Sequence, residues 1–349
     1  MKEICIDVRM AFHGGIGTYI RNIVPRLTGF RLHLLTNRHV LEKWPFLNQS
    51  SVILTSAPIY SIEEQMKIPF LVPRCDLFWT PHYNTPVFSL RAKKRLTTIH
   101  DVNHLIFGKI HKLLYAKVVI QRAIKVSDHL LTISNFSKSE LIKYAKAPTE
   151  KISTLHLGVD TTHFSRWSDE RLSKIREKYK LPQNYFLFVS TLAPHKNVAR
   201  LLSAWHLFSQ EFTDWKLVLV GKSKEKLPPS GTILFLGHVE EEDLPALYQL
   251  AYASVHPSLY EGFGLTPLES MSSGCPAVVS KAASLPEVCG DCAVYIDPCQ
   301  IEDIAQGMRL MVQDKSLYAR LREKGLEWVS RFNWDKTVEG HAEILERLT

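Results

Sequence analysis

The sequence has no run of about 18 consecutive apolar residues, the length that a transmembrane helix requires, although 45% of its 349 residues are hydrophobic. It also lacks a long apolar segment at its start, where Met1–Asp7 carries two acidic residues. We therefore expect a first strand there and not a signal peptide. The composition is typical of a globular protein with a sizeable core, and the length predicts about two domains.

Cysteine is scarce, with six scattered residues. Cys289 and Cys292 have the CxxC spacing, but no second pair is present to complete a zinc site. A metal or redox function of this pair is therefore the lesser alternative. Small, buried and reduced thiols of a cytosolic protein are the favoured interpretation.

Acidic residues are sparse in the first half of the chain. Residues 1–166 hold 23 Lys and Arg against 11 Asp and Glu, a net charge of +12, whereas the remainder has −4. Part of this excess is local, at Arg91, Lys93, Lys94, Arg95, Lys109, Lys112, Lys117, Arg122 and Lys125. A nucleic acid, an anionic membrane or a phosphorylated acceptor would suit this charge, and so would a solvated basic face. Nucleic acid is the weakest choice, because no nucleic-acid-binding motif is present.

Short apolar runs alternate with helical patterns throughout, which predicts α/β layers. In the first half the expected strands are Glu3–Arg9, Arg31–Thr36, Ser51–Thr55, Asp76–Thr80, Arg95–His100 and His129–Ser134. The expected helices are Ile16–Leu27, Lys112–Val126 and Phe136–Tyr144, the last with a capping box at Ser137 and Glu140. We interpret residues 151–170 as a linker.

The alternation then restarts, which predicts a second doubly wound sheet. Its expected strands are Tyr185–Ser190, Lys216–Val220, Ile233–Leu236, Ser254–His256, Ala277–Ser280 and Ala293–Ile296. Its expected helices are Asn197–Glu211, Glu242–Ala251, Pro267–Ser273 and Ile301–Val312. The tail predicts two more helices, Leu317–Arg331 and Trp334–Leu348, by apolar spacing. We expect domains at 1–165 plus 332–349 and at 166–331, facing each other across a cleft at the carboxyl ends of their strands.

Several polar segments follow expected strands. The glycine loop from His13 to Thr18 precedes a helix and would let the backbone approach an anionic ligand. Ile20 breaks the GxGxxG pattern, so a dinucleotide site is disfavoured and a tight turn is the alternative. His100 and Asp101 could hydrogen-bond sugar hydroxyls or stabilise charge, although a His-Asp pair is often structural. Lys196 is expected at a helix start, suited to holding a phosphate, or else solvated.

The segment from Glu261 to Glu269 places two carboxylates around a glycine-rich turn. Carboxylates accept hydrogen bonds from sugar hydroxyls, and N–H groups at a helix start favour phosphate, so the segment would suit a sugar nucleotide. The alternative is structural, because Thr266 and Glu269 also form a capping box with Pro267 at the first helical position. Glu241 and Asp243 have a spacing like that of metal-binding carboxylates, but acid in a first helical turn suits the helix dipole.

Taken together, these segments resemble the retaining glycosyltransferases of family four, which have the GT-B fold of two facing Rossmann-like domains. The likeness rests on Gly14–Gly17, Ile99–Asp101, Leu192–Asn197, Gly237–Val239, Pro257–Pro276, Leu285–Val288, Asp297–Pro298 and Phe332–Trp334. It spans nearly the whole chain, and its most specific part is the Glu261 to Glu269 segment.

The resemblance implies a nucleotide-sugar donor on the second domain and an acceptor on the first. Glu269 would bind the ribose, Glu261 the transferred sugar, Lys196 the diphosphate, and His100 would lie beside the anomeric carbon, so His100, Glu261 and Lys196 are the expected catalytic residues. The other expected substrate-binding residues are Gly15, Gly17, Asp101, Thr191, Val239, Leu244, Gly262, Phe263, Gly264, Leu265 and Thr266. The family often has an Arg where Thr191 or His195 stands here, and neither position has one.

The expected reaction is transfer of a hexose with retention, and no metal is needed if Lys196 and helix-start N–H groups neutralise the diphosphate. The segments at His100 and at Pro194–Asn197 look most like those of mannosyltransferases, which favours GDP-mannose as the donor. The expected acceptor is a glycan or lipid-linked glycan at the cytoplasmic face of an anionic membrane, in cell-surface polysaccharide or lipopolysaccharide assembly. The alternatives are an epimerase or hydrolase of the same fold and an inactive binding subunit.

Overall fold

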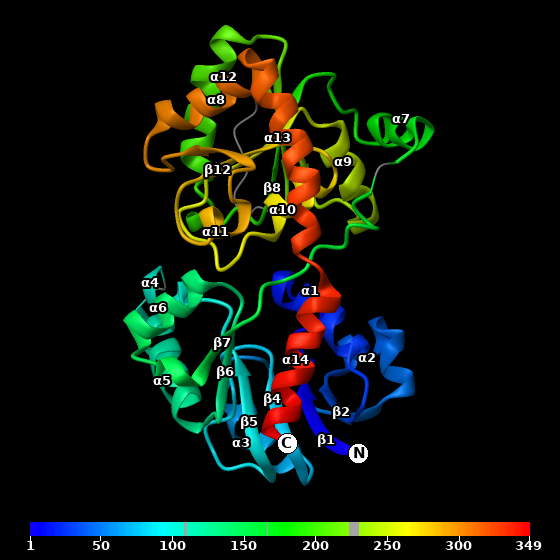
Figure 1. Ribbon diagram of the computed structural model, residues 1–349, viewed down its shortest axis with the longest axis vertical. Helices are drawn as coiled ribbons and strands as arrows, with labels where there is room; N and C mark the ends of the chain where they lie inside the picture. Colours follow the sequence, from blue (N-terminus) through cyan, green and yellow to red (C-terminus); the bar gives the residue numbers. More distant parts are fainter. Residues whose placement is uncertain (108–109, 166, 223–229) are drawn as a thin grey trace. The chain divides into compact units, whose positions relative to one another are not determined.

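The computed structural model describes residues 1–107, 110–165, 167–222 and 230–349. Its contacts divide the chain into two compact units, Met1–Gly158 with Trp334–Thr349, and Val159–Asn333. Each unit is a parallel sheet covered by helices, so the expected α/β class with two doubly wound sheets is confirmed (Figure 1). None of the described helices is both long enough and apolar enough to cross a membrane.

The first unit contains a seven-stranded parallel sheet in the order β3-β2-β1-β4-β5-β6-β7. Five of its strands, all except the edge strands β3 and β7, are buried in their carboxyl-terminal halves, as expected for a sheet covered on both faces. Their bounds are β1 Lys2–Asp7, β2 Phe30–Thr36, β3 Ser51–Leu54, β4 Cys75–Thr80, β5 Ala92–Thr98, β6 His129–Thr132 and β7 Ile152–Thr154. The linker interpretation of residues 151–170 is wrong at its start, because β7 lies there and pairs with β6.

Helices cover both faces of this sheet. The helices α1 Gly14–Ile23 and α14 Trp334–Leu348 pack together on one face, while α5 Ile110–Val126 and α6 Asn135–Ala145 pack together on the other. By the right-handed crossover rule, α3 Ile62–Leu71 lies on the face of α5. The short helices are α2 Arg38–Lys43 and α4 Asn103–Ile106. Ser134, and not Ser137, caps α6, so the capping box predicted at Ser137 and Glu140 is wrong.

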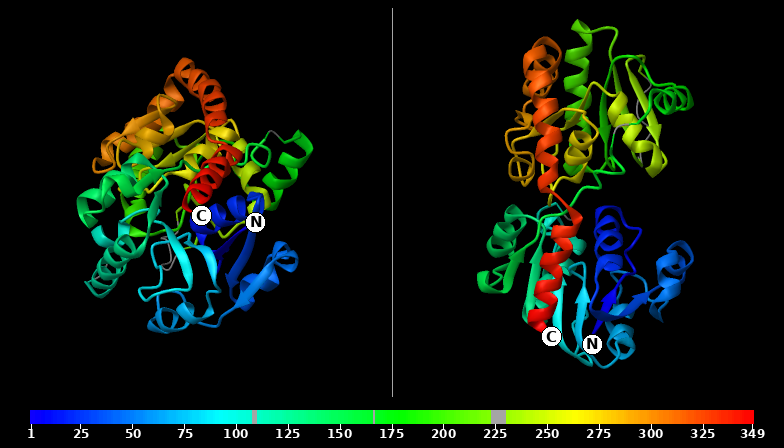
Figure 2. Two further views of the ribbon diagram at one scale, coloured as in Figure 1. Left: turned by 60° about the horizontal axis from the view of Figure 1, so that its bottom comes forward. Right: turned by 45° about the vertical axis from the view of Figure 1, so that its right-hand side comes forward.

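The last helix, α14, packs beside α1 in the first unit (Figure 2). A chain of buried hydrogen bonds ties it there. The hydroxyl of Tyr19 on α1 lies 2.6 Å from Nε2 of His341 and 3.0 Å from Oγ1 of Thr98. The indole of Trp79 donates to the same Thr98 oxygen at 3.0 Å. Nδ1 of His341 lies 2.6 Å from the carbonyl of Thr337, so Nδ1 carries the hydrogen and Nε2 accepts from Tyr19. Burial lowers the pKa of His341 to about 4, which keeps this acceptor available near neutral pH.

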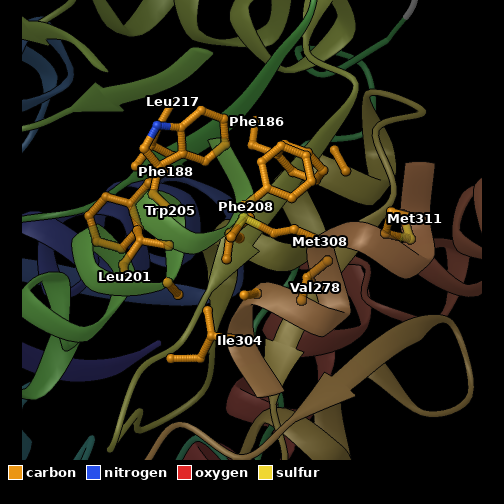
Figure 3. Packing of buried hydrophobic residues seen from close by; sticks show 14 of the residues in the cluster. Phe186, Phe188, Leu201, Trp205, Phe208, Leu217, Val278, Ile304, Met308 and Met311 are labelled. Atoms are coloured by element: carbon orange, nitrogen blue, oxygen red, sulfur yellow. The ribbon is translucent and has the colours of Figure 1, made fainter. Parts of the chain in front are cut away.

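The second unit contains a six-stranded parallel sheet in the order β10-β9-β8-β11-β12-β13. Its strands are β8 Tyr185–Val189, β9 Lys216–Val220, β10 Ile233–Gly237, β11 Ala253–His256, β12 Ala277–Ser280 and β13 Ala293–Ile296. Its helices are α7 Asp169–Lys178, α8 Val198–Glu211, α9 Leu244–Leu250, α10 Leu265–Ser272, α11 Leu285–Cys289, α12 Ile301–Gln313 and α13 Lys315–Trp328. The main core lies where α8 and α12 pack on the sheet, with Phe186, Trp205 and Met308 at its centre (Figure 3).

The cysteines take part in no disulfide. Five of the six are buried, and Cys299 is exposed, so the expectation of buried thiols is wrong for that residue alone. Burial raises the pKa of Cys292 to about 11 and that of Cys289 beyond the usual range, so both stay protonated near neutral pH. No group of three or more potential metal ligands occurs among the residues that the structure describes.

Candidate active site

The second unit has its switch point between the neighbouring strands β8 and β11. From β8 the chain winds outward to β9 and β10, and from β11 it winds the other way to β12 and β13. Open α/β sheets bind ligands outside the carboxyl ends of their strands at this point. Lys196 follows β8 and Glu261 follows β11, so the fold brings two expected site residues, 65 positions apart, to the same place.

Lys196 and Glu261 form a two-point ion pair. Nζ of Lys196 lies 2.7 Å from each carboxylate oxygen of Glu261, and the two side chains are only 18% and 15% exposed. Ser258 donates a third hydrogen bond to the carboxylate at 2.7 Å. Burial by itself would raise the pKa of Glu261, but the charge of Lys196 and these hydrogen bonds lower it overall. The site therefore holds an ionised carboxylate against a cation.

Two residues outside the expected site fix the loops that carry this pair. Asn197 has a left-handed backbone with φ of 63° and donates from its side chain to the carbonyls of Pro257 and Pro298 at 3.0 and 2.6 Å. Ser284 donates to the carbonyls of Glu261 and Phe263 at 2.9 and 2.6 Å. No residue spacing in the sequence predicts such hydrogen bonds from side chains to the backbone of another loop. Asn197 nevertheless belongs to the Pro194–Asn197 segment on which the family resemblance partly rests.

The glycine-rich turn ends at Gly264, whose φ of 109° few other residues adopt. The helix α10 then begins at Leu265, and no side chain caps it at Gly264. The capping box predicted at Thr266 and Glu269 is therefore wrong, since Thr266 is already inside the helix. Glu269 loses its structural explanation as a cap. Gly264 is buried and Thr266 is half-buried.

Glu269 sits in an environment that favours its neutral form. Burial and the nearby Glu241 raise its pKa to about 7, while a hydrogen bond from Tyr248 opposes the shift. The Tyr248 hydroxyl lies 3.5 Å from Oε2 of Glu269. A buried carboxyl group with a raised pKa, close to a strand-end site, is a candidate for a functional role.

The remaining expected residues of this unit lie along the same carboxyl edge. Thr191 is exposed, Val239 and Phe263 are buried, and Gly262, Leu244 and Leu265 are half-buried. Backbone bonds join the loops here, from Leu192 to the carbonyl of Lys222 at 3.3 Å and from Gly221 to that of Gly237 at 2.7 Å. Lys222, at the end of β9, is a cation at this edge that the sequence interpretation overlooked.

Asp243 has a structural role instead of a metal-binding one. Lys178 and Tyr179 donate to its carboxylate at 2.5 and 2.8 Å. Glu241 and Asp243 form a single 3₁₀ turn ahead of α9. The dipole role expected for these acids stays a prediction.

In the first unit the switch point lies between β1 and β4. The glycine loop follows β1, and α1 begins at Gly14. Gly15 is exposed, with nothing within 4 Å of where a side chain would start, whereas such an atom on Gly17 would lie 2.6 Å from the carbonyl of Ala11. Close packing therefore explains Gly17, and open space adjoins Gly15.

His100 follows β5 and packs edge-on against Tyr19, with ring centroids 4.8 Å apart. Its Nε2 lies 2.9 Å from the carbonyl of Pro81, which can only accept, so Nε2 carries the hydrogen and Nδ1 is the acceptor. Burial lowers its pKa to about 4, although Pro81 and Asp101 oppose the shift. His100 is thus neutral at pH 7. The carboxylate of Asp101 accepts from the N–H of Asn103 at 2.9 Å.

A buried ionic network also lies at this switch point, and the sequence interpretation missed it. Arg9 donates to Asp7 at 2.9 and 2.6 Å, to Glu64 at 2.9 Å and to the carbonyl of Ala57 at 3.2 Å. All three ionisable side chains are 1% exposed. Burial would raise the pKa of Asp7, but Arg9 and His82 hold it well below its usual range. In the sequence, the feature that could have indicated this network is the acid Asp7 at the end of β1, followed two residues later by the base Arg9.

Comparison with known proteins agrees with this architecture. A family model, glycosyl transferases group 1, matches residues 171–328. The O-antigen chain mannosyltransferase B of Escherichia coli is 33% identical over 270 residues, which cover 72% of this chain and 71% of that protein. The serotype-specific mannosyltransferase WbdA of the same organism is 29% identical over 63% of this chain, which spans only 29% of WbdA.

Among solved structures, Anabaena Alr3699/HepE in complex with UDP and glucose superposes with a TM-score of 0.82 at 18% identity, over 99% of this chain and 100% of that one. The fold is therefore that of the GT-B glycosyltransferases. The chain belongs to the group 1 family of glycosyltransferases and is mannosyltransferase-like within it.

Proposed function

We propose that this chain is a retaining mannosyltransferase that transfers mannose from GDP-mannose to a growing glycan in cell-surface polysaccharide assembly. Support for the sugar and the process comes from relatives named as mannosyltransferases of O-antigen chains. The observation that carries the proposal is the Lys196–Glu261 pair at the switch point of the second unit.

In this proposal the second unit holds the donor. The ammonium of Lys196 exchanges part of its contact with Glu261 for the diphosphate and stabilises the charge that develops on the leaving group. Glu261, released on one oxygen, accepts a hydrogen bond from a mannose hydroxyl. Glu269 accepts from the ribose hydroxyls, and the backbone from Gly262 to Thr266 lines the sugar and phosphates.

The first unit supplies His100 and the acceptor site. Because Nε2 of His100 is engaged by Pro81, Nδ1 is the nitrogen available to the donor sugar, and it accepts a hydrogen bond from a hydroxyl. A neutral imidazole adds no positive charge beside a carbon that becomes cationic in the transition state. The departing phosphate takes the acceptor's proton on the face where the new bond forms, which retains the configuration at the anomeric carbon.

A thermal-shift screen against nucleotide sugars tests the donor. A ligand that binds only the folded chain raises the melting temperature, by an amount that grows with its concentration over Kd. We expect a shift with GDP-mannose and none with UDP-sugars. NMR of the product should then show an α-linkage from the α-linked donor. A shift with UDP-sugars alone would overturn the donor, and donor consumption without transfer would identify a hydrolase or epimerase.

We also propose that the first unit docks on an anionic membrane, where a lipid-linked acceptor is presented. Ile62, Met66 and Phe70 recur every four residues on α3 and are 80%, 53% and 75% exposed. On α5, the exposed Leu114 and Val118 alternate with the exposed Lys117 and Lys125. Apolar side chains beside lysines on one sheet face suit a negatively charged lipid surface. Of the basic residues singled out in the sequence, Lys109 lies outside the described residues.

Vesicle sedimentation tests this docking surface. Binding to vesicles that contain phosphatidylglycerol should exceed binding to neutral vesicles and should weaken steeply with salt. Replacing Ile62, Met66 and Phe70 together by Ser should abolish it. Leu326→Ser is the matched control, since Leu326 is an exposed leucine, 47% accessible, in the second unit. Binding that ignores both salt and the triple substitution would contradict the proposal.

A further inference from the structure

We propose that Tyr60 and Tyr83 form an aromatic platform that binds a hexose ring of the acceptor glycan; this inference rests on the proposed glycosyl transfer and locates its acceptor. The two rings stack with centroids 5.5 Å apart and planes 28° from parallel. Tyr60 follows β3 and Tyr83 follows β4, so the pair lies at the carboxyl edge of the first sheet. Tyr60 remains 38% exposed.

The chemistry of this pair suits a sugar. A pyranose has apolar C–H faces, which lose water when they pack on an aromatic face, and hydroxyl groups at its rim, which need hydrogen-bond partners. The two phenol hydroxyls interact with each other, and that of Tyr60 also lies 4.0 Å from Sδ of Met10, so a sugar hydroxyl would join this group as a further partner. Burial raises the pKa of Tyr60 to about 12, and that of Tyr83 rises further, so both stay protonated donors; Asp101 is close enough to add to both shifts. The exposed ring of His104 packs against Tyr83 at 5.7 Å.

Tyr60 is held in a conformation that its own side chain disfavours. Its φ is 62°, in the left-handed region that bulky residues rarely adopt. Residues in such conformations persist only when their surroundings enforce them, and they gather at binding sites. A glycine would adopt this backbone conformation without strain. The backbone therefore does not explain the tyrosine, and its side chain must.

The buried ionic network enforces this conformation. The N–H of Tyr60 donates to Glu64 at 2.8 Å, and Glu64 is held by Arg9 and by the side-chain amide of Asn84. Arg9 also holds the carbonyl of Ala57, three residues before Tyr60. The network thus fixes the loop of Tyr60 to the loop of Tyr83, since Asn84 is the next residue along.

Room for more of the glycan adjoins the platform. A cavity of about 600 Å³ lies at the carboxyl ends of β2 and β3, lined by Asn37–His39 and by Leu54–Ile59. The second of these segments leads directly into Tyr60. Asn37 caps α2 through its side chain, and Nε of Arg38 pairs with Glu42, so the other guanidinium nitrogens of Arg38 and the ring of His39 are the polar groups that further sugar hydroxyls could use.

The test uses the whole chain and α-mannotriose as the probe, with Kd measured by saturation-transfer NMR and KM measured in the transfer reaction with the same trisaccharide. Tyr60→Gly removes the ring and the strain together, so we expect a melting temperature at or above that of the wild type. We expect its Kd and KM for mannotriose to rise about tenfold or more, equivalent to about 1.4 kcal/mol. Tyr60→Phe should keep most of the affinity.

Tyr144→Ala is the control, because Tyr144 is another exposed tyrosine of this unit, 45% accessible, and should leave Kd unchanged. The GDP-mannose thermal shift of Tyr60→Gly should equal that of the wild type. Absence of mannotriose binding by the wild type, or an unchanged Kd in Tyr60→Gly, would overturn the platform. Mannotriose binding that depends on Tyr60 with no response to any nucleotide sugar would instead reject the proposed function alone.

Discussion

At the scale of single residues, Glu261 competes with the proposed donor diphosphate for the ammonium group of Lys196. In the free chain both oxygens of Glu261 are taken up by one ammonium group. A diphosphate with its own negative charges must draw Lys196 away from at least one of them. In the proposed function the pair would therefore keep Lys196 ordered and partly desolvated until the diphosphate replaces part of the carboxylate.

Replacing Lys196 tests this role. Lys196→Ala should lower kcat for transfer from GDP-mannose by roughly 10²–10³, by analogy with losing one preorganised donor. Lys281→Ala is the control, since Lys281 is a 60% exposed lysine paired with Asp297 at 3.5 Å in the same unit. It should change kcat little. Turnover like that of the wild type in Lys196→Ala would exclude the role.

The pKa of Glu269, about 7, predicts a pH dependence of donor binding. Ribose hydroxyls donate best to the ionised carboxylate, so Kd for GDP-mannose should be constant above pH 7. Below pH 7 it should rise toward tenfold per pH unit. Because the pKa is raised from 4.5, the unfolded chain binds fewer protons in this window, and the free protein should lose stability as the pH rises from about 4.5 to 7.

Glu269→Gln provides the control for this titration. Its binding of GDP-mannose should be weaker, and its Kd should not change with pH. His100 and His256 have pKa values of about 4 and 3 and stay neutral across the measured range. A flat profile from pH 5.5 to 8.5 in the wild type would argue against the ribose contact.

At the scale of elements, the start of α10 decides where both carboxylates stand. Gly264 lets the chain turn into this helix with φ of 109°, three residues after Glu261 and five before Glu269. A side-chain carbon at Gly264 would lie 2.7 Å from Cδ2 of Leu285 on α11. The glycine is therefore needed for both the turn and the packing.

Gly264→Ala should destabilise the chain by about 1–3 kcal/mol, the usual cost of a disfavoured backbone conformation. It should also reduce the GDP-mannose thermal shift, because Glu261 and Glu269 lose their relative placement. The matched substitution is Gly231→Ala, where nothing lies within 4 Å of the added carbon. Differential scanning fluorimetry with and without donor measures both effects. If Gly264→Ala has the same melting temperature and the same GDP-mannose thermal shift as Gly231→Ala, the turn tolerates a side chain at Gly264.

The strands could be predicted from sequence, and several helix starts could not. Buried parallel strands are short, continuous apolar runs, so β9, β12 and β13 were placed to the residue. Both capping boxes failed, because a Thr or Ser with Glu three residues later also occurs inside a helix. The helix α3 was missed because its exposed face carries Ile62, Met66 and Phe70, which removes the usual contrast between faces.

The site was predictable in part because its residues follow strands, which the sequence predicts well. Lys196 and Glu261 follow strands of one parallel sheet, whose strands bring their carboxyl ends to one edge, and His100 follows a strand of the other sheet. The contact between Lys196 and Glu261, and the support from Asn197 and Ser284, depend on loop conformations 23 to 101 residues apart in the chain. No local pattern encodes such contacts.

At the scale of the whole molecule, the first unit is discontinuous and the second is not. The chain leaves the first unit at Gly158 and returns at Trp334, and these residues touch, since a side-chain carbon on Gly158 would lie 2.3 Å from the nitrogen of Trp334. Apart from His100, every donor residue in the proposal lies within Val159–Asn333. The donor site should therefore survive without the first unit, whereas the first unit should need its last helix.

Cutting the chain at these two points tests this division. Residues 1–158 alone expose Tyr19, Trp79 and Thr98 to water where His341 and its helix pack, and they should show no cooperative thermal unfolding. Residues 1–158 joined to 334–349 by a short Gly-Ser linker should unfold cooperatively, because the ends to be joined are already neighbours. Residues 159–333 should fold alone and respond to GDP-mannose, with Glu269→Gln in the same fragment as the control that binds more weakly. If 1–158 melts at the same temperature as the linked form, α14 contributes nothing to the first unit, and its hydrogen bond to Tyr19 is incidental.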